Sequence, residues 1–148
     1  MIERFETFTV LIAKISRNIR KIKNEEMAEY QLRSAHVSCL YYLYTSNGMT
    51  ATDLCEKCEE DKATISRCLV FLEKEGYLLR EANGAKRYKS QLVLTEKGAL
   101  MGARIAERID SVLEEISAEM TPEERIAFYR ALTLVSDRLD TISRRYEK

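Results

Sequence analysis

Hydrophobic residues near the amino end of the chain recur at alternating steps of three and four, which is the spacing of one seam along a helix. Val10 and Leu11 widen this apolar face. The pattern predicts a first helix that buries one side against a surface larger than its own. The seam consists of Phe5, Phe8, Ile12, Ile15, Ile19 and Ile22.

A second helix is predicted from Ser34 to the turn cluster at residues 46–48. Thr50 and Asp53 have capping-box spacing, so a short helix opens at Ala51. Asp61 is a good N-cap for a longer helix over residues 62–75. Two helices joined by a short turn are typical of a helix-turn-helix.

Gly76 supplies the left-handed position that ends the longer helix, and the period then changes from helix to strand. Residues 77–79 and 91–94 are predicted to be two strands around a loop over residues 81–90, which contains Asn83-Gly84. A β-hairpin after a helix-turn-helix is a wing.

Two further helices are predicted at the carboxyl end. Thr95 caps the first, and Thr121-Pro122-Glu123-Glu124 caps the second with Pro at its first position and Glu at its third. The apolar stripe of the first is Ile105, Ile109, Val112 and Ile116. The apolar face of the second is Ile126, Tyr129, Leu132, Val135, Leu139, Ile142 and Tyr146.

The predicted fold is therefore mostly α with a small β-hairpin wing, a winged helix-turn-helix flanked by amino- and carboxy-terminal helices. We expect one domain over residues 1–148, with residues 31–95 as the winged-helix region and residues 1–30 and 96–148 as dimerisation helices. The length of 148 residues, 45% of them hydrophobic and 32% charged, suits one globular domain.

Charges interrupt the amino terminus where a signal peptide needs an apolar core, and no stretch approaches the ~20 apolar residues of a membrane span. We therefore expect a cytoplasmic protein, with its four cysteines reduced. The formal net charge is zero. Residues 62–89, however, carry seven basic and three acidic side chains, a surplus of +4 that the rest of the chain offsets. A local basic patch of this kind favours nucleic acid.

One face of the predicted helix over residues 62–75 carries small and polar side chains near its start. Small side chains let a helix enter the ~12 Å major groove, where Arg67 is long enough to reach a base edge or a phosphate. Thr64 and Ser66 carry hydroxyls suited to phosphate. The wing tip would follow the DNA backbone or enter the minor groove. The predicted DNA-binding residues are Lys62, Ala63, Thr64, Ser66, Arg67, Val70 and Lys74 on the helix and Lys86, Arg87 and Lys89 on the wing.

Three motifs in this order resemble the MarR family of bacterial transcriptional regulators. They are Asp61-Lys62-Ala63-Thr64-Ile65-Ser66-Arg67, Leu72-Glu73-Lys74-Glu75-Gly76-Tyr77 and Leu94-Thr95-Glu96-Lys97-Gly98. The resemblance implies a homodimer with interlocked terminal helices, in which each subunit presents a winged helix to half of a pseudopalindromic operator. It also implies repression relieved by a small-molecule effector or by stress.

The wing departs from the family pattern. An Asp-x-Arg usually places its Arg seven positions before the threonine that corresponds to Thr95, and here that position is Tyr88. Arg87 stands eight positions before Thr95 and is the expected minor-groove residue.

Several alternatives remain open at this point. The pair Cys55 and Cys58 shares one helix face and His36 and Cys39 another, so that in a helical hairpin His36 lies opposite Cys58 and Cys39 opposite Cys55. Four such ligands suit Zn²⁺, and the same thiols suit a redox switch, although ordinary core packing explains them at less cost. If the cysteines do not bind Zn²⁺, no cofactor is required.

The resemblance also implies that small effectors act near the dimer axis, where aromatic side chains of the first two predicted helices could line a pocket, although such side chains more often belong to an ordinary core or interface. The candidate lining residues are Phe8, Ile12, Tyr41 and Tyr44. A winged helix can also bind another protein in place of DNA. An enzyme is not expected, because the single histidine has no nucleophile or carboxylate constellation and the chain has no phosphate-binding glycine motif.

Overall fold

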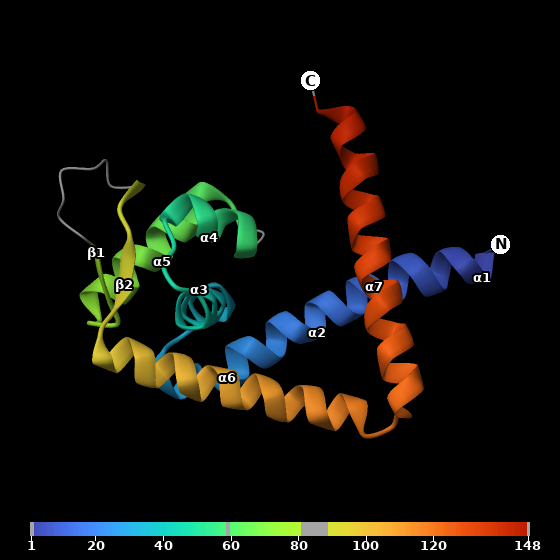
Figure 1. Ribbon diagram of the computed structural model, residues 1–148, viewed down its shortest axis with the longest axis horizontal. Helices are drawn as coiled ribbons and strands as arrows, with labels where there is room; N and C mark the ends of the chain where they lie inside the picture. The colour runs from blue at the N-terminus through green and yellow to red at the C-terminus, as the bar shows by residue number, and fades with distance from the viewer. Residues whose placement is uncertain (1, 59, 81–88, 148) are drawn as a thin grey trace. The chain divides into compact units, whose positions relative to one another are not determined.

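The computed structural model describes residues 2–58, 60–80 and 89–147, which form two compact units, Met1–Arg108 and Ile109–Lys148 (Figure 1). The first unit begins with α1 (Ile2–Phe5), a π-helical turn (Glu6–Val10), α2 (Leu11–Glu26) and a 3-10 turn (Ala28–Tyr30). It continues with α3 (Ser34–Thr45), α4 (Ala51–Cys58), α5 (Lys62–Lys74), β1 (Leu78–Arg80) and β2 (Leu92–Leu94). Helix α6 (Glu96–Ser117) crosses the boundary, and α7 (Pro122–Ser143) with a 3-10 turn (Arg144–Tyr146) follows.

Local capping sets the limits of the helix-turn-helix, as the sequence predicts. The backbone N–H of Thr50 donates to Asp53 Oδ2 at 2.9 Å, and the N–H of Asp53 donates to Thr50 Oγ1 at 3.2 Å, which closes the capping box of α4. At α5, the N–H of Thr64 donates to Asp61 Oδ1 at 2.7 Å. Gly76 ends that helix with a φ of 81°, a left-handed conformation that favours glycine.

The predicted wing strands are confirmed as an antiparallel pair, in which Leu78 faces Leu94 and Arg80 faces Leu92. A β-bridge between Met49 and Leu92 adds a short third partner at the turn before α4. The N–H of Leu92 donates to the carbonyl oxygen of Met49 at 2.9 Å. This bridge, which the sequence did not predict, ties the base of the wing to the start of the helix-turn-helix.

One hydrophobic core holds the winged helix together. Helices α3, α4 and α5 and the start of α6 contribute buried apolar side chains, as do β1, β2 and the segment after α2. Its fully buried large side chains are Met27, Leu32, Cys39, Leu40, Leu54, Ile65, Leu69, Leu72, Leu78 and Ile105. Burying such side chains contributes about 1.5–3 kcal/mol each.

The start of α6 packs closely against the turn between α5 and β1. The N–H of Gly98 donates to Thr95 Oγ1 at 3.0 Å, so Thr95 caps α6 as predicted. A side chain at position 98 would collide with the carbonyl oxygen of Tyr77, because the backbones meet there. Glycine at position 98 is therefore required by close packing.

In the second unit, α7 begins with the predicted capping box: the N–H of Thr121 donates to Glu124 Oε2 at 2.9 Å, and the N–H of Glu124 donates to Thr121 Oγ1 at 3.1 Å. No described residue of α7 is buried. Its predicted apolar face is exposed apart from the half-buried Val135, with Ile126 at 69%. Among the described residues, none of the helices combines the length and the hydrophobicity needed to cross a bilayer.

Candidate nucleic-acid interface

Helix α5 divides cleanly into a buried and an exposed face. Ile65, Cys68, Leu69 and Leu72 point into the core. The opposite face consists of exposed side chains, with Thr64 half-buried at its edge: Lys62, Ala63, Ser66, Arg67, Val70 and Lys74. These are the helix residues predicted to bind DNA, and the structure brings them together on one surface.

The first turns of α5 suit the approach of a polyanion. Ala63 and Ser66 are small, so another backbone can come close to the helix. The Arg67 guanidinium donates to Thr64 Oγ1 at 3.3 Å and remains exposed. Val70, of which 52% is exposed, offers methyl groups of the kind that contact thymine.

Asp61 caps the same end of α5 from the exposed side. The backbone N–H of Thr64, followed by its side chain, holds the pKa of this carboxylate below its usual value of 3.8. The cap satisfies one of the free N–H groups at the helix start, and Asp61 places a negative charge beside the surface. Phosphates would therefore contact the flank of α5 carrying Lys62 and Arg67 rather than its extreme end.

Three side chains outside α5 fix its carboxyl end. Arg80 of β1 pairs with Glu73 through Nε and Oε2 at 3.2 Å. Thr95 Oγ1 donates to the carbonyl oxygen of Gly76, and Lys97 Nζ donates to that of Glu75, both at 2.6 Å. Sequence reasoning missed these positioning roles, although the motif over residues 94–98 contains two of the three residues.

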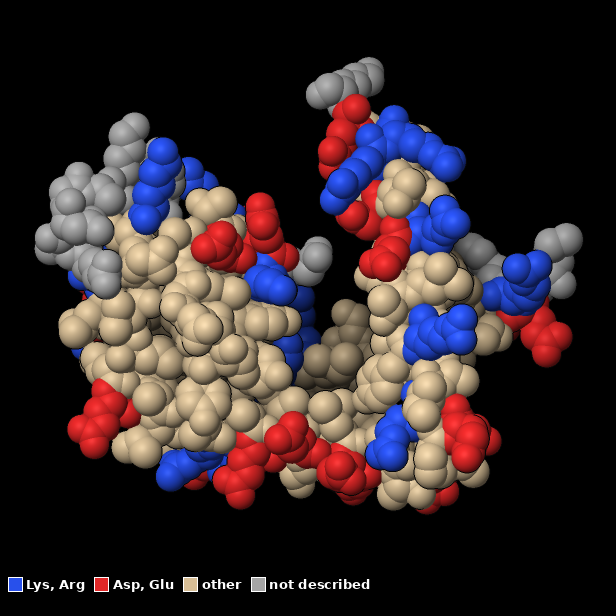
Figure 2. Space-filling model, in the orientation of Figure 1, with Lys and Arg blue, Asp and Glu red and all other residues tan. Residues whose placement is uncertain are grey.

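Only one of the three wing residues predicted to bind DNA lies within the described part of the chain. Lys86 and Arg87 lie outside the described residues, and so does Tyr88, where the wing departs from the family pattern. Lys89 is exposed and lies three residues before the start of β2. Figure 2 shows Lys or Arg side chains beside the grey segment at the tips of the two strands. Basic side chains therefore accompany both the helix and the described base of the wing.

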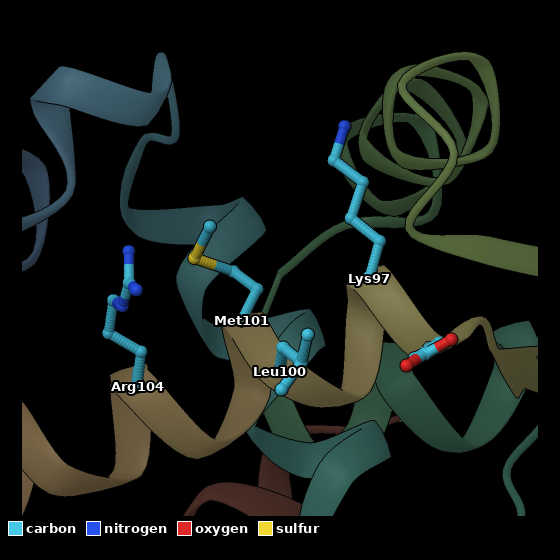
Figure 3. A pocket seen from close by; sticks show the side chains of 5 residues that line it. Lys97, Leu100, Met101 and Arg104 are labelled. Carbon is cyan, nitrogen blue, oxygen red and sulfur yellow. The ribbon is translucent and has the colours of Figure 1, made fainter.

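The four residues predicted to line an effector pocket occupy different environments. Phe8 and Ile12 are exposed on the first helices, and Tyr41 is half-buried. Tyr44 packs its Cβ and ring against Gly102 of α6, where a larger residue would not fit. A hollow of about 360 Å³ lies instead along α6 (Figure 3), lined by Glu96, Lys97, Leu100, Met101 and Arg104.

The hollow along α6 has basic side chains that already have partners. Lys97 also lies 4.4 Å from the centre of the Tyr77 ring, and Arg104 stacks over Tyr30 at 5.2 Å. Lys97, Met101 and Arg104 project to the same side of the helix in Figure 3. These contacts explain how α6 is attached to the winged helix.

The predicted pairing of the cysteines and histidine is wrong. Cys39 interacts with Cys58 rather than with Cys55, and also with Cys68 of α5, while His36 lies beside Cys68 and stacks on Phe71 at 4.5 Å. Of the two cysteines of α4, Cys58 is the one that approaches Cys39 of α3, and Cys68 approaches Cys39 from α5. Among the described residues, no group of three or more His, Cys, Asp or Glu side chains is arranged to hold a metal ion.

Comparisons with known proteins give a consistent picture. The model of the MarR family matches residues 32–87. Of the curated relatives, the HTH-type transcriptional regulator YwoH of Bacillus subtilis is 29% identical over 79% of this chain and 85% of its own length. The HTH-type transcriptional regulator BilQ of Clostridioides difficile is 22% identical over 90% of each chain.

Solved structures share the fold. NMB1585, a MarR family regulator from Neisseria meningitidis, superposes with a TM-score of 0.78 at 21% identity, covering 96% of this chain and 98% of its own. MepR of Staphylococcus aureus in complex with DNA superposes with a TM-score of 0.79 at 19% identity, covering 89% and 97%. The winged helix-turn-helix predicted from the sequence is thereby confirmed as the fold.

Proposed function

We propose that this chain is a transcriptional regulator of the MarR family, whose model matches residues 32–87, and that it binds a pseudopalindromic operator in double-stranded DNA as a homodimer and represses transcription. In this proposal, α5 enters the major groove and the wing follows the backbone. The structure of MepR in complex with DNA supports DNA as the ligand of this fold.

The observation that carries the proposal is the exposed face of α5. A surface helix without a ligand needs no particular order of side chains on its solvent side. Here small residues occupy the first turns, and Arg67, Val70 and Lys74 follow at the spacing of one face. Major-groove recognition needs this combination of close approach, a long donor and an apolar contact.

Exposed apolar side chains on the terminal helices support a homodimer. On the first helices they are Phe8, Val10, Leu11, Ile12, Ile15, Ile19 and Ile22, and on α7 they include Ile126, Phe128, Tyr129, Leu132, Leu134, Leu139 and Ile142. Monomeric proteins rarely expose apolar patches of more than a few hundred Å². A second copy of the chain would cover them and place two recognition helices roughly 34–36 Å apart, one turn of DNA.

Regulation would follow from the geometry of such a dimer. An effector that binds more tightly to a dimer whose recognition helices no longer match the half-site spacing shifts the population away from DNA. We propose that the protein acts in this way in the cytoplasm, where its operator would be, without a required cofactor and without an enzymatic step.

The test is selection of DNA by the whole protein. Genomic fragments retained by the purified chain are sequenced, and binding to the enriched site is followed by fluorescence anisotropy at several salt concentrations. We expect one enriched pseudopalindrome, two chains per duplex, and an affinity that falls steeply with salt. Lys89→Ala should lower the slope of log affinity against log salt concentration by about 1, which corresponds to the loss of one phosphate contact. Retention of no sequence above background, with salt-insensitive binding, would overturn the proposal.

A further inference from the structure

The polar side of α2 carries an unusual concentration of positive charge. Residues 7–24 contain five basic side chains and no acidic one, a surplus of +5 that exceeds the +4 of residues 62–89. All of the five are exposed except the half-buried Lys23. They are Lys14, Arg17, Arg20, Lys21 and Lys23. Charge of one sign at this density favours a polyanionic ligand.

The four exposed cations share one face of the helix. Lys14, Arg17 and Lys21 follow one another at steps of three and four, and Arg20 adjoins Arg17 at a step of three. We call these four residues the basic face. The apolar seam of α2 occupies the opposite side of the helix. A second copy of the chain that covers the seam would therefore leave the basic face open.

The basic face differs from an ordinary solvated face, which mixes the two signs of charge. Helix α6 carries five acidic and three basic side chains, and α7 carries four and three. On α2, three of the four positions one turn away from Arg17 are cations, Lys14, Arg20 and Lys21, and the fourth is Ala13. Like charges at these spacings destabilise a helix. A bound polyanion would remove that repulsion.

Contacts at the carboxyl end of α2 fix the helix against the winged helix. The backbone N–H of Ser34 donates to Asn24 Oδ1 at 2.6 Å, and Lys23 Nζ donates to Ser38 Oγ at 3.1 Å. Both partners belong to α3, and from there α2 leads away toward α1 (Figure 1). The turns that carry the basic face thus have a fixed direction next to the winged helix, and their side chains remain exposed.

Arg20 joins the basic face to the start of α5. Its guanidinium lies 3.9 Å from the Glu60 carboxylate, and Glu60 directly precedes Asp61, the cap of α5. The Arg20 side chain is still 67% exposed. Since a guanidinium has five N–H donors, it can contact a second anion while it faces Glu60. The basic face therefore begins beside the first turn of the helix proposed to enter the major groove.

We propose that the basic face of α2 is a second DNA-binding surface, which contacts the phosphate backbone next to the half-site that α5 reads. This inference rests on the proposed function, because the winged helix brings the duplex to α2. Contacts to phosphate carry no sequence information directly, and they release counterions from the duplex. The basic face thus contributes affinity that is the same for every sequence and that falls as the salt concentration rises.

An anionic lipid surface is the other polyanion that a basic amphipathic helix can bind. Lipid would have to take up the apolar seam of the same helix, and the proposed homodimer covers that seam. The contact of Arg20 with Glu60 also places the basic face beside the helix proposed to bind DNA. These observations favour duplex DNA as its ligand.

The experiment compares the salt dependence of DNA binding between variants of the whole protein. Anisotropy is measured at several salt concentrations with the enriched operator and with an unrelated duplex of equal length. The triple variant Lys14→Gln, Arg17→Gln, Lys21→Gln should lower the slope of log affinity against log salt concentration by about 3, equally on both duplexes. A single change such as Arg17→Ala should lower it by only about 1. The variant Lys14→Arg, Arg17→Lys, Lys21→Arg keeps the charge and should keep the slope.

A matched control removes the same charge from the carboxyl end of the chain. It replaces by Gln three exposed arginines, Arg130, Arg138 and Arg145, and should leave the slope unchanged. Circular dichroism and light scattering confirm the helicity and the mass of each variant. Gln is a good helix former and fewer like charges remain, so the triple variant of α2 should be no less stable than the unmodified chain. If it does not fold, Lys21→Gln alone is measured, with an expected decrease in slope of about 1.

An unchanged slope in the triple variant would overturn the proposal, and so would an equal decrease in the arginine control. Co-sedimentation with vesicles of phosphatidylglycerol and phosphatidylcholine tests the lipid. Vesicle binding that the triple variant loses, with an unchanged slope on DNA, would also overturn the proposal.

The two proposals fail in different ways. Because phosphate contacts do not depend on sequence, the unrelated duplex gives a result for the basic face even if no operator is found. Failure to enrich an operator would count against the proposed function alone. An unchanged slope on an enriched operator would remove the basic face from the interface and leave the proposed function standing.

Discussion

The guanidinium of Arg67 donates a hydrogen bond to the hydroxyl of Thr64, one turn earlier on α5, at 3.3 Å. Thr64 in turn donates its backbone N–H to Asp61, so the cap of the helix and its long basic side chain belong to one network. This network restrains Arg67 before any ligand arrives. A side chain that is already restrained loses less conformational entropy when it binds.

Arg67→Ala should therefore weaken binding to the enriched operator by about 1–3 kcal/mol, or roughly 5- to 150-fold in Kd, because a bidentate contact to a base or phosphate is lost. Fluorescence anisotropy at fixed salt measures the change. Arg17→Ala removes another exposed arginine, on α2 outside its apolar seam, and controls for the loss of one positive charge. Equal affinities of Arg67→Ala and the unmodified protein would show that α5 does not read the operator.

Gly98→Ala should destabilise the fold strongly, since the added methyl group meets the carbonyl oxygen of Tyr77. We expect a loss of about 3 kcal/mol or more in the free energy of unfolding, the upper end of the range for overpacking. Urea denaturation at one fixed protein concentration measures it.

Gly76→Ala is the matched control for Gly98→Ala. Nothing lies within 4 Å of its added methyl group, so only the left-handed backbone opposes alanine there, at about 1–2 kcal/mol. If Gly98→Ala costs less than Gly76→Ala, then α6 is not held by the close backbone approach seen in the structure.

The elements of the winged helix were predictable because their limits are set by neighbouring residues. The residues that set these limits act on positions no more than four away along the chain, and each acts as its residue type predicts. They are Thr50 with Asp53, Asp61 with Thr64, and Gly76. The exposed face of α5 follows from the helical period alone, once the helix is placed.

Contacts between distant elements were not predictable in the same way. The pairing of Cys39 with Cys58 and Cys68 depends on how three helices cross. The prediction from a helical hairpin of α3 and α4 alone gives Cys55 as the partner, which is wrong. The hydrogen bond of Lys97 to the Glu75 carbonyl joins residues 22 positions apart. Such relationships depend on packing rather than on local spacing.

The Asp61 cap should make stability depend on pH. Its pKa is lower in the folded chain than the usual 3.8, so its stabilising effect is complete above that value and is lost as the pH falls through the lower, folded pKa. Asp61→Asn keeps a good N-cap without a titrating group. The difference in unfolding free energy between the two proteins should thus be constant near neutral pH and change in favour of Asp61→Asn below about pH 4.

Urea unfolding at pH 7, 5, 4 and 3 measures this difference. The two curves share every other titrating group, so their difference isolates position 61. A difference that stays constant down to pH 3 would mean that the hydrogen bond from Thr64 does not stabilise the charged form.

Ile15→Asp tests the apolar face of α2. The side chain is 52% exposed in the single chain and would be buried in the proposed homodimer. Its replacement removes about 1.5–3 kcal/mol of burial and adds a desolvated charge, so we expect dimerisation to weaken by at least about 10-fold. Light scattering over a dilution series, with circular dichroism to check helicity, measures the change in mass.

Lys21→Asp is the control, because it introduces the same carboxylate on the same helix but outside the apolar seam. It should leave the mass at that of a dimer. If Ile15→Asp also remains a dimer at the lowest concentration, the face formed by Ile12, Ile15, Ile19 and Ile22 does not join two copies of the chain. If the unmodified chain is itself monomeric, the pseudopalindromic operator loses its structural basis, because a single winged helix reads only one half-site.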